Sequence, residues 1–185
     1  MSLPFCDSLN DRHNDAPPLE LLTIPDSVRR IGTYALAYCR NLTELSIPDG
    51  VTHIGERAFE GCETLESVKL PANLKELGEY AFFLCDKLRA VSIPEGITRI
   101  APGTFFGCSL LRRVDIPNTV VSIGKEAFMN CDSLRSITIP EGVEEIGESA
   151  FYGCTRLEKV IIPESVKRIG QDAFKGCKGL PAMTL

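Results

Sequence analysis

Residues 134–156 read LRSITIPEGVEEIGESAFYGCTR, and this 23-residue stretch decides the fold because the chain repeats its pattern without insertions. Two residue types mark the period. Pro recurs every 23 residues from Pro25 to Pro163, and Cys recurs every 23 residues from Cys39 to Cys177. Self-similarity at a fixed period of about 20 to 50 residues is typical of proteins that stack identical coils. The sequence therefore predicts a repeat solenoid.

The register of the repeat predicts the domain organisation. Residues 1–18 do not follow the pattern and are expected to form an irregular lead-in or a degenerate N-terminal cap. We expect a single solenoid domain over 19–185, in which residues 180–185 begin an eighth repeat. Because solenoids need polar end caps, this C-terminal end suggests a truncated array or an end that pairs with another molecule. The full repeats are 19–41, 42–64, 65–87, 88–110, 111–133, 134–156 and 157–179.

The first half of each repeat predicts a short strand. In residues 134–156, Ile137 and Ile139 alternate with polar residues, so the two isoleucines are expected to face inward. Pro140 follows them and has no N–H to donate to a neighbouring strand. Its recurrence at one register therefore trims every strand to the same length.

The second half of each repeat predicts shorter elements. Val143 and Ile146 supply two more inward residues and indicate a possible second short strand. Gly147 recurs, with Ala101 replacing it once, which favours tight packing over an obligatory left-handed conformation. Residues 149–154 carry apolar side chains at helical spacing, enough for one 3₁₀ or α turn. The expected fold class is an α/β repeat solenoid with little regular helix.

Stacking these coils aligns like side chains inside the solenoid. The aligned Phe residues are expected to form a buried ladder that is structural. The seven periodic Cys are expected to be free buried thiols, because parallel side chains stacked in register do not point at each other; disulfides between adjacent repeats and metal ligation are the alternatives. The Phe positions are Phe59, Phe82, Phe105, Phe128, Phe151 and Phe174, with Leu36 opening the column.

The composition is that of a folded protein and excludes several partners. The chain is 44% apolar and 24% charged, with a formal net charge of −5. This acidic balance argues against a nucleic-acid partner, which favours a basic surface. No run of apolar residues approaches the length needed to cross a bilayer, so membrane insertion is not expected.

The repeat pattern resembles a known family. The motif I-P-x-x-V-x-x-I-G-x-x-A-F-x-x-C-x-x-L-x-x-V-x is similar to the BspA-like (Treponema pallidum-type) leucine-rich repeat, found in bacterial surface proteins and some protozoa, over residues 19–185. The resemblance implies a right-handed leucine-rich-repeat coil with one short parallel-sheet strand per repeat. For surface members it also implies adhesion to host proteins such as fibronectin or fibrinogen. The chain departs from the commoner leucine-rich repeat in having Pro and Gly where that repeat has an Asn ladder.

The compartment is left open by two opposing signals. The resemblance implies the cell surface or secretion. Residues 1–20 lack the apolar core of a signal peptide, and free thiols are typical of the cytoplasm. We therefore expect either an intracellular protein or a fragment without its leader.

Catalysis is not expected, because no group of residues converges on a recognisable active site. The two histidines, His13 and His53, have no triad partners at a spacing that would force them together. No Cys or His pair has the spacing of a zinc site, and no glycine-rich loop precedes a long helix. We expect no cofactor and no metal.

Two surfaces are candidates for protein binding. The first is the outward face of the strands, which is polar and mixed in charge and is either a solvated face or a ligand surface. The second is an apolar stripe at the position that follows the Phe ladder, which either covers the edge of the core or contacts a partner. The strand-face residues include Arg113, Asp115, Ser136, Thr138, Lys159 and Ile161; the stripe comprises Phe83, Phe106, Met129 and Tyr152.

These surfaces predict a non-enzymatic protein–protein interaction module. Adhesion to host or extracellular proteins is the first interpretation, and an intracellular scaffold or regulatory repeat protein is the alternative. The protein ligand is not identified by any motif. Self-association is a further hypothesis, through either the C-terminal end or the apolar stripe.

Overall fold

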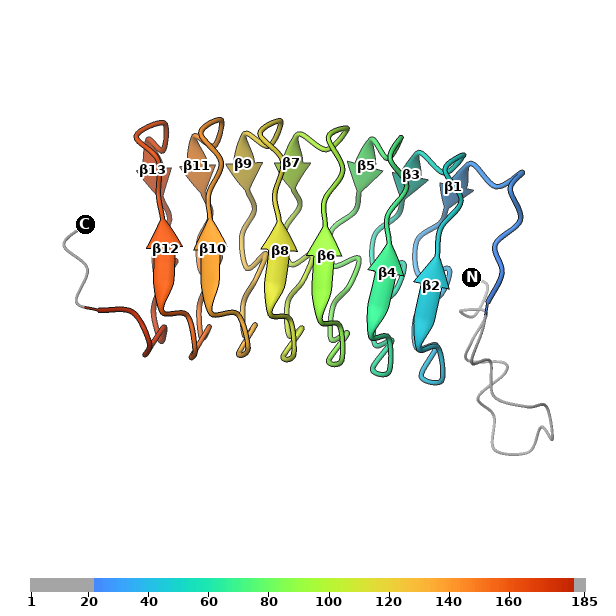
Figure 1. Cartoon of the computed structure of the whole chain (residues 1–185), viewed down its shortest axis with the longest axis horizontal. Helices are drawn as coiled ribbons and strands as arrows, with labels where there is room; N and C mark the ends of the chain where they lie inside the picture. Colours follow the sequence, from blue (N-terminus) through green and yellow to red (C-terminus); the bar gives the residue numbers. More distant parts are fainter. Residues whose placement is uncertain (1–21, 182–185) are drawn as a thin grey trace.

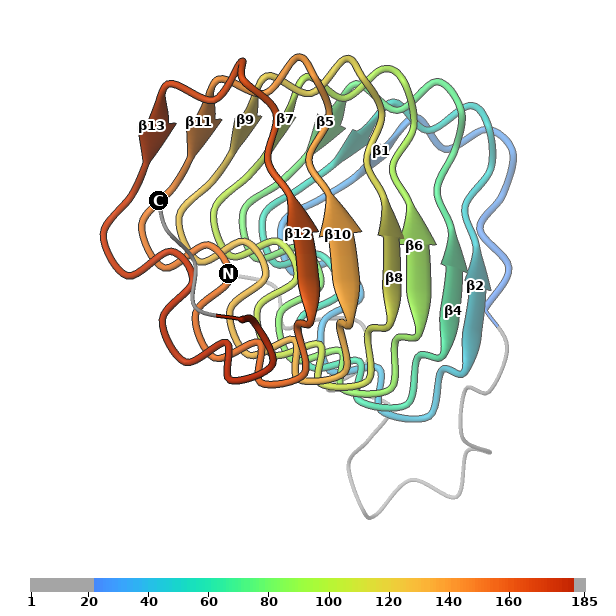
Figure 2. The same ribbon diagram turned by 60° about the vertical axis from the view of Figure 1, so that its left-hand side comes forward.

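The chain folds into a solenoid of short parallel strands, seen in a computed structural model that describes residues 22–181 (Figure 1). The six repeats from residue 42 onward each contribute a three-residue strand to a front row, and all seven repeats contribute a two-residue strand to a rear row. Figure 2 shows the two rows around one coil. The front row contains β2 (Glu44–Ser46), β4 (Ser67–Lys69), β6 (Ala90–Ser92), β8 (Arg113–Asp115), β10 (Ser136–Thr138) and β12 (Lys159–Ile161). The rear row contains β1 (Arg30–Ile31), β3 (His53–Ile54), β5 (Glu76–Leu77), β7 (Arg99–Ile100), β9 (Ser122–Ile123), β11 (Glu145–Ile146) and β13 (Arg168–Ile169).

The strands confirm the expected coil, and the second short strand is present in every repeat. The 3₁₀ or α turn expected over 149–154 is absent, and residues 22–181 contain no helix. Reverse turns take its place, because Ser149 and Gly153 adopt φ of 53° and 72°, a left-handed conformation that a right-handed helix excludes. Hydrogen bonds from Tyr152 N to Ser149 O (3.0 Å) and from Cys154 N to Phe151 O (3.3 Å) close these turns.

The Phe ladder forms the centre of the core. The five rings from Phe59 to Phe151 are fully buried. Successive ring centroids lie 5.0 to 5.6 Å apart with nearly parallel planes. Phe174 continues the stack at 5.2 Å from Phe151, although it is only partly buried. Stacking in register explains why one aromatic residue is repeated without exception from Phe59 onward.

The Cys column lies beside the ladder. Six cysteines are free, and each thiol donates a hydrogen bond of 3.1 to 3.2 Å to the carbonyl oxygen of the residue 26 positions earlier. Burial raises the pKa of Cys108 and Cys131, so these thiols stay protonated and unreactive. The expectation of free thiols is wrong for Cys39, whose sulfur is disulfide-bonded.

The front strands are hydrogen-bonded in pairs of repeats. Full three-residue pairing joins β2 to β4, β6 to β8 and β10 to β12. Between these pairs, β4 and β6 share a single residue pair and β8 is not paired with β10. Figure 1 shows the wider spacing at these two junctions.

A polar side chain accompanies each closed front junction. Asn73, Thr119 and Ser165 occupy the same turn position in alternate repeats. Each reaches back to a backbone carbonyl of the preceding repeat, at 3.3 Å to Asp49 O, 2.8 Å to Ile97 O and 2.8 Å to Val143 O, respectively. The repeats between them carry glycine at this position, at Gly50, Gly96 and Gly142. The array is therefore built from units of two repeats, with a period of 46 residues.

The rear row has one open junction, between β5 and β7. At the closed rear junctions, a glycine amide donates to the preceding repeat, as from Gly78 N to Ile54 O (2.9 Å) and from Gly124 N to Ile100 O (2.8 Å). A Cβ on Gly78 would lie 2.5 Å from the carbonyl carbon of Gly55. Ala101 carries such a Cβ, so its repeat is held away from the preceding one. The interpretation of this position as a site of tight packing agrees with this geometry.

Two predicted segments lie partly or wholly outside the described residues. These are the lead-in over residues 1–18 and most of the eighth repeat expected after Gly179. The domain boundaries therefore stay a prediction.

Candidate protein-binding surfaces

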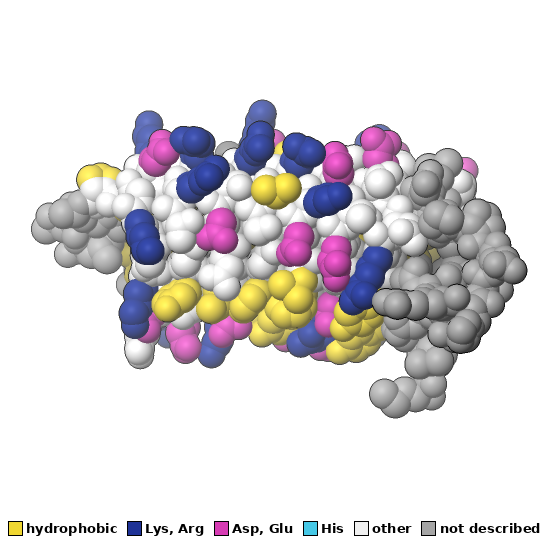
Figure 3. All heavy atoms as spheres, turned by 90° about the horizontal axis from the view of Figure 1, so that it is seen from below, with side chains coloured by type: hydrophobic (Ala, Val, Ile, Leu, Met, Phe, Trp, Pro, Cys, Tyr) yellow, Lys and Arg dark blue, Asp and Glu magenta, His cyan; other side chains and the backbone are white. Residues whose placement is uncertain are grey.

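The apolar stripe lies on the outside of the turns that carry the Phe ladder. Phe83, Phe106, Met129 and Tyr152 each directly follow a ladder residue, and all four are half-buried. Reverse turns separate the two columns, since each stripe amide donates to the carbonyl three residues earlier, as from Phe106 N to Gly103 O (3.0 Å). The rings of Phe83 and Phe106 lie 5.1 Å apart. Figure 3 shows hydrophobic side chains gathered in a band along this side of the molecule.

The stripe continues into an aromatic cluster around Arg57. The Arg57 guanidinium lies 4.6 Å from the centroid of the Tyr80 ring and 5.6 Å from that of Phe83. Tyr80 packs edge-on against Phe83 at 5.7 Å. Tyr34 lies on the other side of Arg57, at 6.0 Å, and is 39% exposed. A cation held between aromatic rings extends the partly exposed apolar surface toward the N-terminal repeats.

Glu60 fixes this cluster from beneath. Its carboxylate is buried and accepts hydrogen bonds from Arg57 Nη1 (2.8 Å) and from the Tyr38 hydroxyl (2.5 Å). The hydrogen bond to Glu60, followed by burial, raises the pKa of Tyr38 to about 12. The same carboxylate raises the pKa of Arg57. The cluster is thus a charged and hydrogen-bonded unit rather than a loose set of rings.

The Arg57 cluster was not predicted from the sequence, because only the column that directly follows the Phe ladder was considered for the stripe. In the stripe column, Ala37 and Glu60 mark the apparent N-terminal limit of the apolar residues, and both are in fact buried. Tyr34, Arg57 and Tyr80 belong to the neighbouring column, three positions earlier in the repeat. Three large side chains at a position that elsewhere carries Gly, Glu, Ser or Asp were the signal available.

The strand-face residues point outward, as expected. Arg113 and Asp115 on β8 form an exposed ion pair with Nε and Oδ1 2.9 Å apart. On the next pair of strands, Ser136 aligns with Lys159, and Thr138 aligns with Ile161, which is 47% exposed.

Four of these six residues surround one groove. It has a volume of about 460 Å³ and lies at the open junction between β8 and β10. Arg113 and Asp115 line one side, and Ser136 and Thr138 line the other. Lys159 and Ile161 lie one strand further on and do not line it. The strand face is thus divided by a polar cleft where backbone pairing is interrupted.

Metal-ion clusters and membrane-spanning helices are both absent from residues 22–181. No group of three or more His, Cys, Asp or Glu side chains there is arranged to hold a metal ion. In the same part of the chain, no helix is long and apolar enough to cross a membrane.

Known proteins share this fold and its repeat. The chain is similar to the T. pallidum leucine-rich repeat protein TpLRR at 35% identity and a TM-score of 0.80, over 84% of this chain and 72% of that one. A leucine-rich repeat protein from Eubacterium ventriosum ATCC 27560 matches at 27% identity and a TM-score of 0.79, over 88% of this chain and 43% of that chain. One from Bacteroides ovatus ATCC 8483 matches at 25% identity and a TM-score of 0.53, over 84% and 70% of the two chains.

Comparison of sequences gives the same family. No curated protein matches the chain significantly. Six copies of the BspA type leucine rich repeat region match it, over residues 12–113 and 100–185. Together with the 35% identity to the T. pallidum protein, this places the chain in the BspA-type leucine-rich-repeat family.

Proposed function

We propose that the protein is a non-enzymatic protein-binding module that contacts its partner through the apolar stripe and the Arg57 cluster. The observation that carries this proposal is a run of partly exposed large side chains along consecutive repeats, at Phe83, Phe106, Met129 and Tyr152. Large apolar surfaces rimmed by polar residues are typical of interaction sites. Tyr and Arg, which the cluster adds, are enriched among the residues that dominate binding energies.

The test replaces the outer side chains and leaves the ladder intact. Phe83→Ser, Phe106→Ser and Tyr152→Ser in one chain should abolish binding and lower the melting temperature by about 6 to 12 °C. Each partly exposed ring is expected to contribute about 1 kcal/mol, and 1 kcal/mol shifts the melting temperature of a chain of this size by about 2 to 4 °C. Leu110→Ser with Val121→Ser is the control, since these residues are 36% and 50% exposed and lie outside the stripe. A collapse of stability in the triple variant would instead make the stripe part of the core.

The family suggests a more specific proposal about the kind of partner. We propose an extracellular host protein, as in surface members of the BspA-like family, with an intracellular scaffold as the second candidate. The six free thiols favour the second, whereas the disulfide at Cys39 favours the first. Immobilised fibronectin and fibrinogen are the probes, and the absence of binding at micromolar concentrations of the chain contradicts adhesion to these two proteins.

Self-association through the stripe or through the C-terminal end can be tested with the same triple variant. Within the last described repeat, Phe174, Val166 and Ile169 are only partly buried, whereas their counterparts in the sixth repeat are fully buried. Light scattering of the wild-type chain and the triple variant separates the two routes. If the wild-type chain forms dimers and the triple variant does not, the dimer contact is the stripe. If both form dimers, the contact is assigned to the C-terminal end.

A further inference from the structure

Arg112 is an exposed cation between two other arginines. Arg89, Arg112 and Arg135 occupy one position in the fourth, fifth and sixth repeats, and glutamates occupy it in the third and seventh. The outer arginines pair away from the centre, Arg89 Nη2 with Glu66 Oε2 at 3.2 Å and Arg135 Nη1 with Glu158 Oε1 at 2.7 Å. Among residues 22–181, Arg112 has no ion-pair partner. Like charges at aligned positions of neighbouring repeats repel. At Arg112, no anion of the described residues compensates for this repulsion.

The open groove lies directly beside Arg112. The amide of Arg112 donates to the Arg89 carbonyl at 2.8 Å, but within the described residues no equivalent bond joins Arg135 to Arg112. The groove at this interruption is lined by Arg112, Arg113, Asn118, Ser136 and Thr138, among others. Guanidinium, amide and hydroxyl groups therefore line one solvent-filled space, together with the Asp115 carboxylate, which is paired with Arg113. Above the hydrophobic band in Figure 3, Lys and Arg side chains are interspersed with Asp and Glu side chains.

We propose that Arg112 and this groove bind a side-chain carboxylate from an acidic segment of a partner protein. Guanidinium binds carboxylate through two parallel hydrogen bonds. Ser136 and Thr138 lie across the groove and can donate further hydrogen bonds to the bound segment. The inference rests on the proposed protein-binding function but uses a surface that excludes the stripe residues.

The charges around the groove favour a short acidic segment over a long polyanion. Glu66 and Glu158 limit the arginine column at both ends, and Asp115 already neutralises Arg113 on β8. A sulfated glycan or nucleic acid carries charge continuously and would run past these carboxylates. The net charge of −5 also disfavours a long polyanion. One or two carboxylates match the single uncompensated arginine.

Fluorescence polarisation with a labelled hexaglutamate peptide tests the proposal on the full chain. Hexaglutamate should bind saturably and less tightly as salt rises, while a hexaglutamine peptide should not bind. Arg112→Gln should weaken binding about tenfold, the lower end of what hydrogen bonds to a charged group contribute. Arg112→Lys should recover part of the loss, because a point charge replaces the planar guanidinium.

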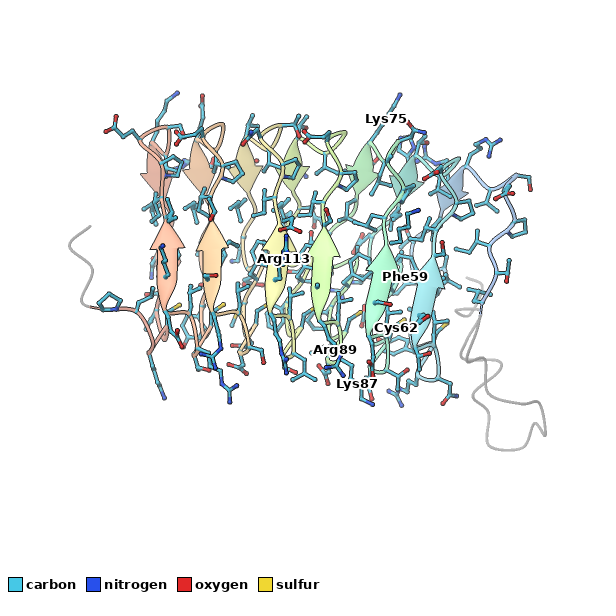
Figure 4. All side chains as sticks on the ribbon, in the orientation of Figure 1. Phe59, Cys62, Lys75, Lys87, Arg89 and Arg113 are labelled. Atoms are coloured by element: carbon cyan, nitrogen blue, oxygen red, sulfur yellow. The ribbon has the colours of Figure 1, made fainter. Side chains whose placement is uncertain are left out.

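A charge-matched control separates the site from net charge. Arg112→Glu and Lys75→Glu each change the net charge by two, and Lys75 lies at the opposite edge of the solenoid from Arg89 (Figure 4). Arg112→Glu should abolish binding and leave the melting temperature unchanged or higher, because a glutamate would pair with Arg89 or Arg135. Lys75→Glu should retain binding within twofold.

Three results would overturn the proposal. These are an equal loss in Lys75→Glu, hexaglutamate binding in Arg112→Gln within twofold of wild type, and tighter binding of a heparin hexasaccharide than of hexaglutamate. The triple stripe variant should bind hexaglutamate normally. Failure of the stripe as a partner site and failure of the carboxylate site therefore give different results.

Discussion

Two successive junctions of the solenoid share the inward positions of the repeat but differ in packing. Between the fourth and fifth repeats, β6 pairs with β8 over three residues and β7 pairs with β9. Between the third and fourth repeats, β4 and β6 share one residue pair and β5 and β7 share none. At the closed junction, Gly124 lies next to the rear row and Thr119 next to the front row. At the open junction, Ala101 and Gly96 occupy these two positions. We expect these two positions to control whether a junction is closed or open.

The interior columns continue through both junctions. Phe82 and Phe105 face each other across the open junction at 5.6 Å, and Phe105 and Phe128 across the closed one at 5.4 Å. The Cys108 thiol also bridges the open junction, at 3.2 Å from Phe82 O. Backbone hydrogen bonds of the turns also cross the open junction, as from Phe82 N to Thr104 O at 2.9 Å. The core columns and these turns therefore keep the solenoid continuous where the strands separate.

The largest expected effect comes from removing the ring that belongs to both junctions. Phe105→Ala should lower the free energy of unfolding by about 3 to 5 kcal/mol, the usual cost of truncating a buried Phe. Phe106→Ala, one residue later, should cost about 1 kcal/mol, a typical value for a point substitution, because its ring is already partly exposed. Chemical denaturation of both variants measures the difference. Equal losses would show that the stripe and the ladder form one core.

Opening the closed junction should have the next largest effect. A Cβ on Gly124 would lie 2.7 Å from Pro102 N and 2.8 Å from the Ala101 carbonyl carbon. Gly124→Ala should therefore separate β7 from β9 and cost about 1 to 3 kcal/mol, as overpacking usually does. Gly32→Ala is the matched control, since nothing lies within 4 Å of its added Cβ. Backbone entropy alone favours alanine over glycine, so a loss in Gly32→Ala as large as in Gly124→Ala would contradict the assignment of the effect to contacts at the junction.

Thr119 tests the front of the closed junction with a smaller change. Thr119→Val keeps the shape but removes the hydrogen bond to Ile97 O, which is 2.8 Å long. We expect a loss of about 1 kcal/mol, typical of one hydrogen bond, and faster amide hydrogen exchange in β8. Thr98→Val, at an exposed position in the same region, should change neither quantity. If hydrogen exchange in β8 is unchanged in Thr119→Val, the Thr119 hydroxyl does not stabilise the pairing of these two repeats.

The sequence predicts the coil well because its inward positions are repeated. Ile137 and Ile139 alternate as a strand requires, and the second strand at Ile146 follows from the same apolar pattern. The two-repeat unit was also visible, as glycine at positions 50, 96 and 142 alternating with Asn73 and Thr119, but only a comparison at 46 residues reveals it. Averaging over 23 residues hides this alternation.

The candidate surfaces were predictable only in part. The stripe follows from one column of the repeat, whereas the isolation of Arg112 depends on where Arg89 and Arg135 find their partners. Those partners lie 23 residues away and on the outer sides of both arginines. The exception at Ala101 was visible in the sequence. Its consequence was not, because it depends on how closely the backbones of the third and fourth repeats approach each other.

The smallest change in stability is expected from closing the open junction. Ala101→Gly removes the Cβ that holds the fourth repeat away from the third. The amide of residue 101 should then donate to Leu77 O, as the amide of Gly124 donates to Ile100 O at 2.8 Å. The free energy of unfolding should change by less than about 1 kcal/mol, because the added glycine loses more backbone entropy on folding and offsets the new hydrogen bonds. Hydrogen exchange is the decisive measurement, and the amide of residue 101 should become protected to the level of Gly124. If that amide exchanges at the wild-type rate, the Cβ of Ala101 is not what separates β5 from β7.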